Sequence, residues 1–212
     1  MADVKICGIK TQADLIAVHH AGARWAGFVF FEKSPRHLTL DDARSLRDHL
    51  DAFMAPPVPV ALVVDADDAS LDAIVAAVRP GLIQCHGKES PERVQMIKTR
   101  YNVNVMKAIR VAHAETLKLA EAYDGFADMM LFDSAPTGAI LPGGTGHRFD
   151  WSLMQAYEGK TPWMLAGGLT PDNVAEAIRI SGAKSVDVSS GVDESPGNKD
   201  HAAIHRFVSA AL

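Results

Sequence analysis

The sequence predicts an α/β fold, a single-domain (β/α)8 TIM barrel that spans residues 1–212. Short apolar runs alternate eight times with amphipathic stretches of helical periodicity. The order of these segments shows no topological switch point and no linker interrupts it, which favours a barrel over a doubly wound sheet. A chain of 212 residues with 48% hydrophobic residues is also large enough to bury one core of this kind.

Each expected strand is rich in aliphatic residues, and each is followed by a stretch whose apolar residues recur with helical spacing. The expected strands are residues 3–7, 25–31, 58–64, 82–85, 103–109, 128–132, 163–165 and 185–188. The expected helices are residues 11–22, 40–53, 68–78, 90–100, 113–122, 150–158, 171–181 and 200–211. The prolines of the segment 56–59 stand between a helix and the next strand, where proline often ends a helix, so they favour a stop over a hinge.

Composition and charge narrow the classes of partner. The net charge is -5 and the sequence pI is near 6.0, so the basic surface that dominates nucleic-acid binding is missing. No apolar run approaches the roughly 18 residues of a membrane span, and the N-terminus does not have the pattern of a signal peptide. Cys7 and Cys85 form neither a disulfide framework nor a metal-ligand cluster. We therefore expect a cytoplasmic protein with a small-molecule partner, no nucleic acid, no membrane and no metal. We expect a monomer and leave a homodimer open, because no expected helix carries an obvious apolar patch.

The active site of such a barrel lies at the carboxyl ends of the strands, in the loops that follow them. Polar residues gather at these positions: Cys7, Arg36, Gln84, His86 and Asp133. Glycine-rich loops follow the last three strands, and the segment 134–148 is long enough to form a lid.

Alternation along the first strand places Lys5 and Cys7 on the same face. A lysine ammonium close to the thiol favours the thiolate form. Asp187 has the same inward parity on the last strand, which closes against the first, so we expect Lys5 to lie between Cys7 and Asp187. A structural ion pair without catalytic effect is the alternative. The same alternation turns Cys85 outward, toward the helix layer.

Seven ordered motifs resemble those of the phosphoribosylanthranilate isomerase family, across nearly the whole chain. The motifs are Lys5–Ile9, Gly27–Phe30 with Ser34–Arg36, Gln84–Gly87, Leu131–Ser134, Gly143–Gly146 with Phe149–Trp151, Ala166–Leu169 and Val186–Val192. One glycine motif alone would be weak evidence, whereas seven motifs in the expected order are specific.

The resemblance implies an Amadori rearrangement in tryptophan biosynthesis, without a cofactor. The phosphosugar substrate N-(5-phosphoribosyl)anthranilate would become 1-(2-carboxyphenylamino)-1-deoxy-D-ribulose 5-phosphate. By resemblance, Asp133 is the general acid and Cys7 is the general base. We expect burial to raise the pKa of Asp133 and a neighbouring cation to lower that of Cys7.

The resemblance also implies a separate site for each of the two anions of the substrate. Backbone N–H groups of glycine turns suit the phosphate, and the guanidinium of Arg36 suits the anthranilate carboxylate. The expected substrate-binding residues are Arg36, Gln84, His86, Gly144, Gly146, Gly167, Gly168, Asp187, Ser190 and Gly191. Ordinary turn formation is the alternative for any one glycine pair.

Three other functions have weaker support in the sequence. The histidine-pathway isomerase that performs the same rearrangement uses aspartates at the ends of strands one and five, whereas this chain has Cys7 and a single glycine-rich half. A barrel that has lost its activity and acts as a binding or scaffold protein would not need both Cys7 and Asp133. A redox function is disfavoured because the two cysteines do not form a C-x-x-C pair.

Overall fold

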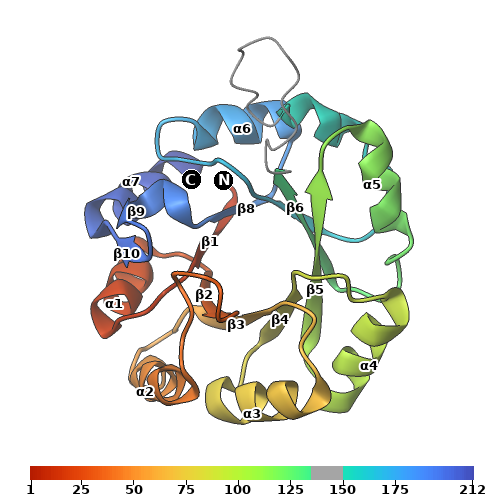
Figure 1. Ribbon diagram of the computed structural model, residues 1–212. Helices are drawn as coiled ribbons and strands as arrows, with labels where there is room; N and C mark the ends of the chain where they lie inside the picture. The colour runs from red at the N-terminus through yellow and green to blue at the C-terminus, as the bar shows by residue number, and fades with distance from the viewer. Residues whose placement is uncertain (135–149) are drawn as a thin grey trace.

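The computed structural model describes residues 1–134 and 150–212, and in these residues eight parallel strands close into a barrel surrounded by helices (Figure 1). Each strand pairs with its neighbours in chain order, and β8 closes against β1. The strands are β1 (Asp3–Cys7), β2 (Trp25–Phe30), β3 (Val58–Val63), β4 (Leu82–Cys85), β5 (Asn104–Val111), β6 (Met129–Ser134), β7 (Trp163–Leu165) and β8 (Ser185–Val188). The predicted TIM barrel is confirmed.

Most helices of the outer layer begin at a side-chain cap. In α1, the Thr11 side chain accepts from the backbone N–H of Asp14, while the Asp14 carboxylate accepts from the backbone N–H of Thr11, which forms a capping box. The helices are α1 (Gln12–Ala21), α2 (Leu40–Leu50), α3 (Asp68–Val78), α4 (Pro91–Tyr101), α5 (Ala114–Glu121), α6 (Val174–Ser181) and α7 (His201–Ala211). None of the helices in the described ranges is long and apolar enough to span a membrane.

The core has two parts, one on each side of the barrel wall. A small cluster fills the barrel and includes Trp25, Val60, Met106 and Leu131. A larger cluster lies between the strands and the helices and includes Cys85, as alternation predicted. The strands therefore present one face to the barrel interior and the other to the helix layer.

Two elements differ from the sequence prediction. The helix expected over residues 150–158 is a short 3-10 helix, η1 (Trp151–Ala156). A second 3-10 turn, η2 (Ser190–Val192), follows β8 and leads into an unpredicted hairpin, β9 (Asp193–Ser195) and β10 (Asn198–Lys199). This hairpin lies beside the carboxyl end of β1 and stands between β8 and α7 in the chain (Figure 1).

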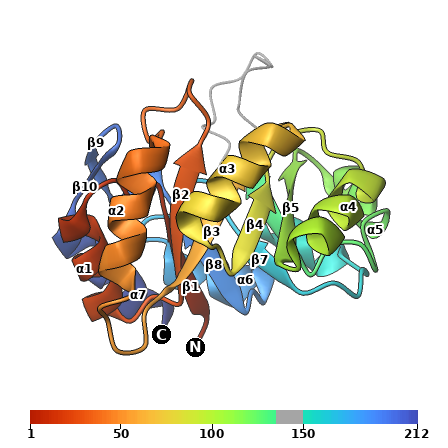
Figure 2. The ribbon, with the colours of Figure 1, turned by 90° about the horizontal axis from the view of Figure 1, so that it is seen from below.

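The two ends of the chain lie together at the amino end of the barrel (Figure 2). The backbone N–H of Ala2 donates to the carbonyl of Ala211 at 3.0 Å, so the start of β1 is joined to the end of α7. The loops that carry the predicted site lie at the opposite end.

Candidate active site

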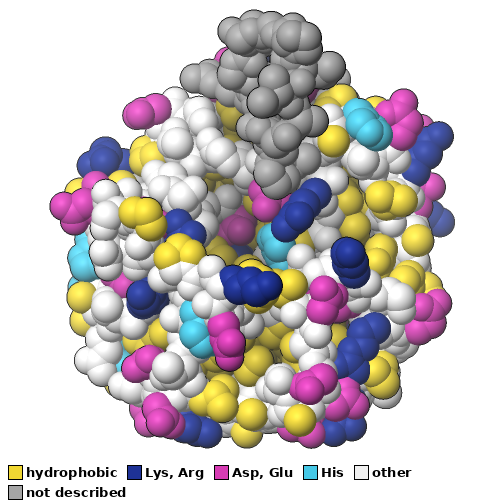
Figure 3. Space-filling view, in the orientation of Figure 1, with side chains coloured by type: hydrophobic (Ala, Val, Ile, Leu, Met, Phe, Trp, Pro, Cys, Tyr) yellow, Lys and Arg dark blue, Asp and Glu magenta, His cyan; other side chains and the backbone are white. Residues whose placement is uncertain are grey.

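The carboxyl ends of the strands surround a cavity of about 600 Å³. Figure 3 shows the molecule hollowed at this end, with acidic, basic and histidine side chains around the hollow. The predicted site residues that line it are Cys7, Arg36, Gln84, His86, Asp133, Gly167, Gly168, Asp187, Ser190 and Gly191. Gly144 and Gly146, and all of the expected lid except Ser134, lie outside the described residues. The structure thus brings every described member of the predicted set to one cavity.

The pairing expected for Lys5 is confirmed. Lys5 and Asp187 are register partners on β1 and β8, and the fully buried Lys5 Nζ donates to Asp187 Oδ1 at 3.0 Å. The expectation that the pKa of Cys7 is lowered is wrong. Burial of the thiol, together with the charge of Asp187, raises this pKa and outweighs the opposing charges of Lys5 and Lys199.

Asp133 has the pKa shift expected for a general acid. Burial, followed by the negative charge of Asp187, raises its pKa from 3.8 to about 6. His86 Nε2 lies 3.6 Å from Asp133 Oδ2. Burial, followed by the charge of Lys5, lowers the pKa of His86 to about 4, so the imidazole is neutral near pH 7.

Gln84 sets the orientation and tautomer of this imidazole. Its amide nitrogen lies 3.0 Å from His86 Nδ1, and the buried Gln84 side chain points into the barrel mouth from β4. An amide N–H can only donate, so Nδ1 is the acceptor and the ring proton is on Nε2, the atom that faces Asp133. Gln84 and His86 therefore act as a unit beside the predicted acid.

The glycines after β7 and β8 allow two loops to approach each other closely. Gly167 and Gly168 have φ values of +87° and +67°, a region that disfavours side chains. A Cβ atom at Gly191 would lie 1.9 Å from the Leu169 carbonyl oxygen, so only glycine fits there. Within the described part of the chain, the N–H groups of Gly167 and Gly168 donate to no other protein group. These amides are suitable donors for an anion.

Sequence reasoning missed three charged residues at this site. Arg110 lines the cavity from β5, next to Asp133 in the register. Asp193 and Lys199 stand in the hairpin after β8, and Asp193 accepts from Arg36. The alternation of Met106 and Ala108 would have placed Arg110 inside the barrel if the expected strand 103–109 had been extended by one residue. No local signal connects Asp193 with Arg36, which is 157 positions away in the sequence.

Comparison with known proteins identifies the family. The family model described as N-(5'phosphoribosyl)anthranilate isomerase matches residues 4–210. A relative from Parvibaculum lavamentivorans, named N-(5'-phosphoribosyl)anthranilate isomerase, is 50% identical over 98% of this chain and 97% of its own length. A relative of the same name from Brucella canis is 48% identical over 98% of this chain and 93% of its own length.

Solved structures give the same result. Phosphoribosyl anthranilate isomerase from Thermotoga maritima is 35% identical, with a TM-score of 0.87 over 100% of this chain and 98% of that one. A further structure is a phosphoribosyl anthranilate isomerase in complex with reduced 1-(o-carboxyphenylamino)-1-deoxyribulose 5-phosphate. It is 32% identical, with a TM-score of 0.85 over 100% of this chain and 98% of that one. This chain therefore belongs to the phosphoribosylanthranilate isomerase family.

Proposed function

We propose that this isomerase converts N-(5-phosphoribosyl)anthranilate to 1-(2-carboxyphenylamino)-1-deoxy-D-ribulose 5-phosphate, with Asp133 as general acid and Cys7 as general base. One observation carries the proposal: both groups line a single cavity that also contains Arg36 and the amide donors of Gly167 and Gly168. The cavity thus offers an acid, a base and two separate anion sites, which are the parts that this rearrangement requires.

The first step opens the ribose ring. Asp133 donates its proton to the furanose oxygen while the bond between that oxygen and C1' breaks. The lone pair of the anthranilate nitrogen forms a C=N bond, which gives an iminium ion. The raised pKa of Asp133 supports this role, because a carboxyl group with an ordinary pKa would have little proton to donate near neutral pH.

In the second step a proton leaves C2'. Cys7 as thiolate takes this proton, and the electron pair of the C–H bond forms the C1'=C2' bond of an enolamine while the iminium nitrogen recovers its lone pair. The C2' hydroxyl then loses its proton and C1' gains one, which yields the ketone. Lys5 stabilises the thiolate, since its charge opposes the effect of burial on Cys7.

The reaction needs a protonated Asp133 and a deprotonated Cys7, yet the pKa of Cys7 is higher than that of Asp133. Between pH 6 and the raised pKa of Cys7, the pair holds one proton, mostly on the thiol. The reactive arrangement is the minority form, with the proton on Asp133 and the negative charge on Cys7. Anions of the substrate raise the pKa of both groups, so they favour this form only as far as they raise the pKa of Asp133 more than that of Cys7.

The anion sites orient the substrate between these groups. The amides of Gly167 and Gly168 bind the phosphate, together with Ser190 and Gly191 on the neighbouring loop. Arg36 binds the anthranilate carboxylate from the side of the cavity that holds Cys7. The ligand bound by one solved relative, a reduced carboxyphenylamino deoxyribulose phosphate, carries the same two anions.

The test generates the substrate in situ from anthranilate and phosphoribosyl pyrophosphate and follows the loss of anthranilate-type fluorescence. We expect rapid loss with the wild type and a decrease of about 10³-fold or more for Cys7→Ala and Asp133→Asn. Cys85→Ala is the matched control, because Cys85 is fully buried on the outer side of the barrel wall, and it should keep most of the activity. An inactive wild type, or a Cys7→Ala protein with normal turnover, would overturn the proposal.

A further inference from the structure

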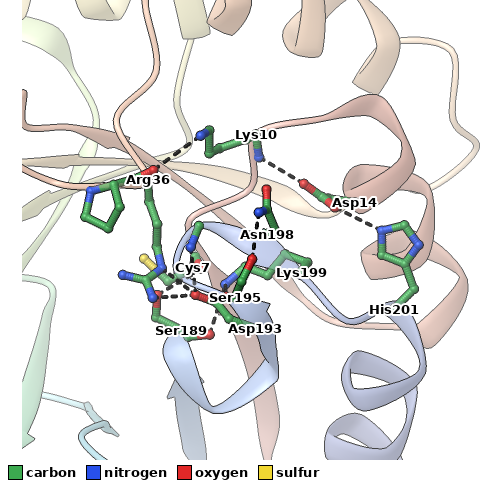
Figure 4. A network of polar contacts seen from close by, with 12 residues as sticks. Cys7, Lys10, Asp14, Arg36, Ser189, Asp193, Ser195, Asn198, Lys199 and His201 are labelled. Carbon is green, nitrogen blue, oxygen red and sulfur yellow. Dashed lines mark hydrogen bonds and ion pairs between the residues drawn. The ribbon is translucent and has the colours of Figure 1, made fainter.

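The hairpin β9–β10 places the buried carboxylate of Asp193 against the guanidinium of Arg36 (Figure 4). Asp193 Oδ2 accepts from Arg36 Nε at 3.1 Å and also from Arg36 Nη2. The same oxygen accepts from the backbone N–H of Gly197 at 3.1 Å, while Asp193 Oδ1 accepts from Lys199 Nζ at 2.7 Å. Asp193 is thus the centre of a network that joins the hairpin to the carboxylate-binding side of the cavity.

The charges of this network leave Arg36 with a net attraction for an anion. The side chain of Asp193 is 4% exposed and that of Lys199 is 0% exposed, so water screens neither charge well. An Arg36–Asp193 pair alone would be neutral. Lys199, which also donates to the carbonyl of Ser189 at 2.9 Å, gives the three side chains a net charge of +1. A substrate carboxylate would bring the net charge of this group to zero.

The aliphatic part of Arg36 packs against the backbone of Gly8. A Cβ atom at Gly8 would lie 2.3 Å from Arg36 Cδ, so the arginine crosses directly over the residue that follows Cys7. The chain before Arg36 is fixed on two sides. Lys10 Nζ donates to the Pro35 carbonyl at 3.2 Å, and a Cβ at Gly197 would lie 2.6 Å from the same oxygen.

The planar guanidinium has two edges that can bind a carboxylate with two hydrogen bonds. Asp193 occupies the Nε–Nη2 edge, which leaves the Nη1–Nη2 edge for a ligand. A guanidinium without this partner could rotate about its side-chain bonds and could present either edge. Its orientation toward the cavity therefore depends on the hairpin.

We propose that Asp193 and Lys199 are positioning residues that orient Arg36 and thereby determine the selectivity of the site for a ligand with an aromatic carboxylate. This inference rests on the proposed function, since it assigns the carboxylate contact to Arg36. Neither Asp193 nor Lys199 is among the residues that line the cavity.

The experiment measures carboxylate selectivity by calorimetry. Two ligands are compared: reduced 1-(o-carboxyphenylamino)-1-deoxyribulose 5-phosphate and the same compound without the carboxylate. The readout is the ratio of their dissociation constants. In the wild type we expect the carboxylate to improve binding by about tenfold or more. Asp193→Asn should reduce this ratio to near one and leave the affinity for the ligand without carboxylate within about twofold. Asp193→Glu, which keeps a carboxylate, should retain most of the ratio.

Two further variants separate positioning from folding. Asp72→Asn is the matched control, because it removes an exposed carboxylate that accepts from Arg100 on the outer surface, and it should keep the wild-type ratio. If Asp193→Asn does not fold because Lys199 is left buried without its partner, Asp193→Asn/Lys199→Met removes both charges and should show the same loss of selectivity. In an Arg36→Met background, Asp193→Asn should change the ratio by less than about twofold.

Each outcome decides the question. A wild-type or increased ratio in a folded Asp193→Asn protein would overturn the inference, because it would show that the net charge of the group and not the orientation of Arg36 sets the selectivity, and so would an equal loss of affinity for both ligands. A wild type that binds neither ligand would instead overturn the proposed function.

Discussion

Two buried lysines on the barrel strands lie on opposite sides of the wall. Lys5 on β1 points into the barrel, toward Asp187 and Cys7. Lys107 on β5 alternates with Met106 and Ala108 of the inner cluster, so it faces the helix layer. Both lysines have a carboxylate partner, yet their surroundings differ in how completely each ammonium is satisfied.

Lys107 uses all three of its donors. Its Nζ donates to the Gly87 carbonyl at 2.6 Å, to Glu89 Oε2 at 2.9 Å and to the Cys85 carbonyl at 3.4 Å. Glu89 accepts in turn from the backbone N–H of Asp65 at 2.9 Å. This pair thus joins β4, the loop after it and the end of β3.

Lys5 has one carboxylate oxygen within 3.0 Å, and its charge acts on the Cys7 thiol. A buried ammonium with spare donors can respond when a neighbour gains negative charge, whereas one with three fixed acceptors cannot. Among the described residues the Lys107 ammonium has three fixed acceptors and the Lys5 ammonium has fewer, so we expect the first pair to maintain the structure and the second to act in catalysis.

Among the variants that test the comparison of the two lysines, Lys5→Met should have the largest effect. Loss of the cation removes the stabilisation of the Cys7 thiolate, so we expect kcat/KM to fall by about 100-fold or more. Steady-state turnover of substrate generated in situ measures this, with the thiol pKa followed by ultraviolet absorbance of the thiolate in a Cys85→Ala background. If both the turnover and the thiol pKa stayed at the wild-type values, the catalytic role of Lys5 would be contradicted.

Lys107→Met should have the opposite profile. Glu89 would remain buried without its cation, which costs about 3–5 kcal/mol of unfolding free energy, while kcat falls by less than about fivefold. Urea denaturation and turnover on the same samples measure both quantities. Lys107→Met/Glu89→Gln is the control, because it removes both charges and should recover part of the lost stability. A stable Lys107→Met protein with greatly reduced activity would contradict the structural role.

The acid side of the pH profile is a third expectation. The pKa of Asp133 is about 6, so kcat/KM should be constant between this value and the raised pKa of Cys7. It should fall below about pH 6, as the pair takes up a second proton and Cys7 can no longer be ionised. Lys107→Met should leave this limb in place, since Lys107 lies on the other side of the wall. An unchanged kcat/KM from pH 7 down to pH 5 would contradict the assignment of Asp133.

Asp133→Asn tests how much the buried carboxylate of Asp133 lowers the free energy of unfolding. The pKa of this carboxyl is raised from 3.8 to about 6, so the native state binds the proton more tightly than the unfolded state does. Native stability therefore decreases as the pH rises from about 4 to above 6. The asparagine variant should be more stable than the wild type at pH 8, by at most about 3 kcal/mol, and should gain little at pH 4. If the variant and the wild type had the same unfolding free energy at both pH values, the site would not destabilise the carboxylate of Asp133.

Much of the fold could be predicted because the local patterns are strong. All eight strands were expected within two residues of their ends, and parity alone placed Lys5 opposite Asp187. Proximity at the barrel mouth followed from topology, since every βα loop is at the same end. The outcome for Cys7 could not be predicted in this way, because the balance between burial and the charge of Lys5 depends on the packed structure.

The remaining residues were missed for three different physical reasons. Arg110 was excluded because the predicted strand ended at residue 109, whereas β5 continues to Val111. Asp193 and Lys199 lie in strands of three and two residues, too short for periodicity, although Pro196-Gly197 between them is a turn signal. Lys107 was passed over because sequence alone does not show that Glu89, in a loop, folds back to pair with it.

The hydrogen bond between Ala2 and Ala211 makes a circular permutation of the chain possible. Because the ends meet at the amino end of the barrel, a short linker could join them without crossing the cavity. The chain could then be opened at another amino-end loop, such as residues 102–103 between α4 and β5. A circular permutant of this kind should retain the same barrel and the same mouth, and a second protein fused to Met1 or to Leu212 would stand away from the entrance for substrate.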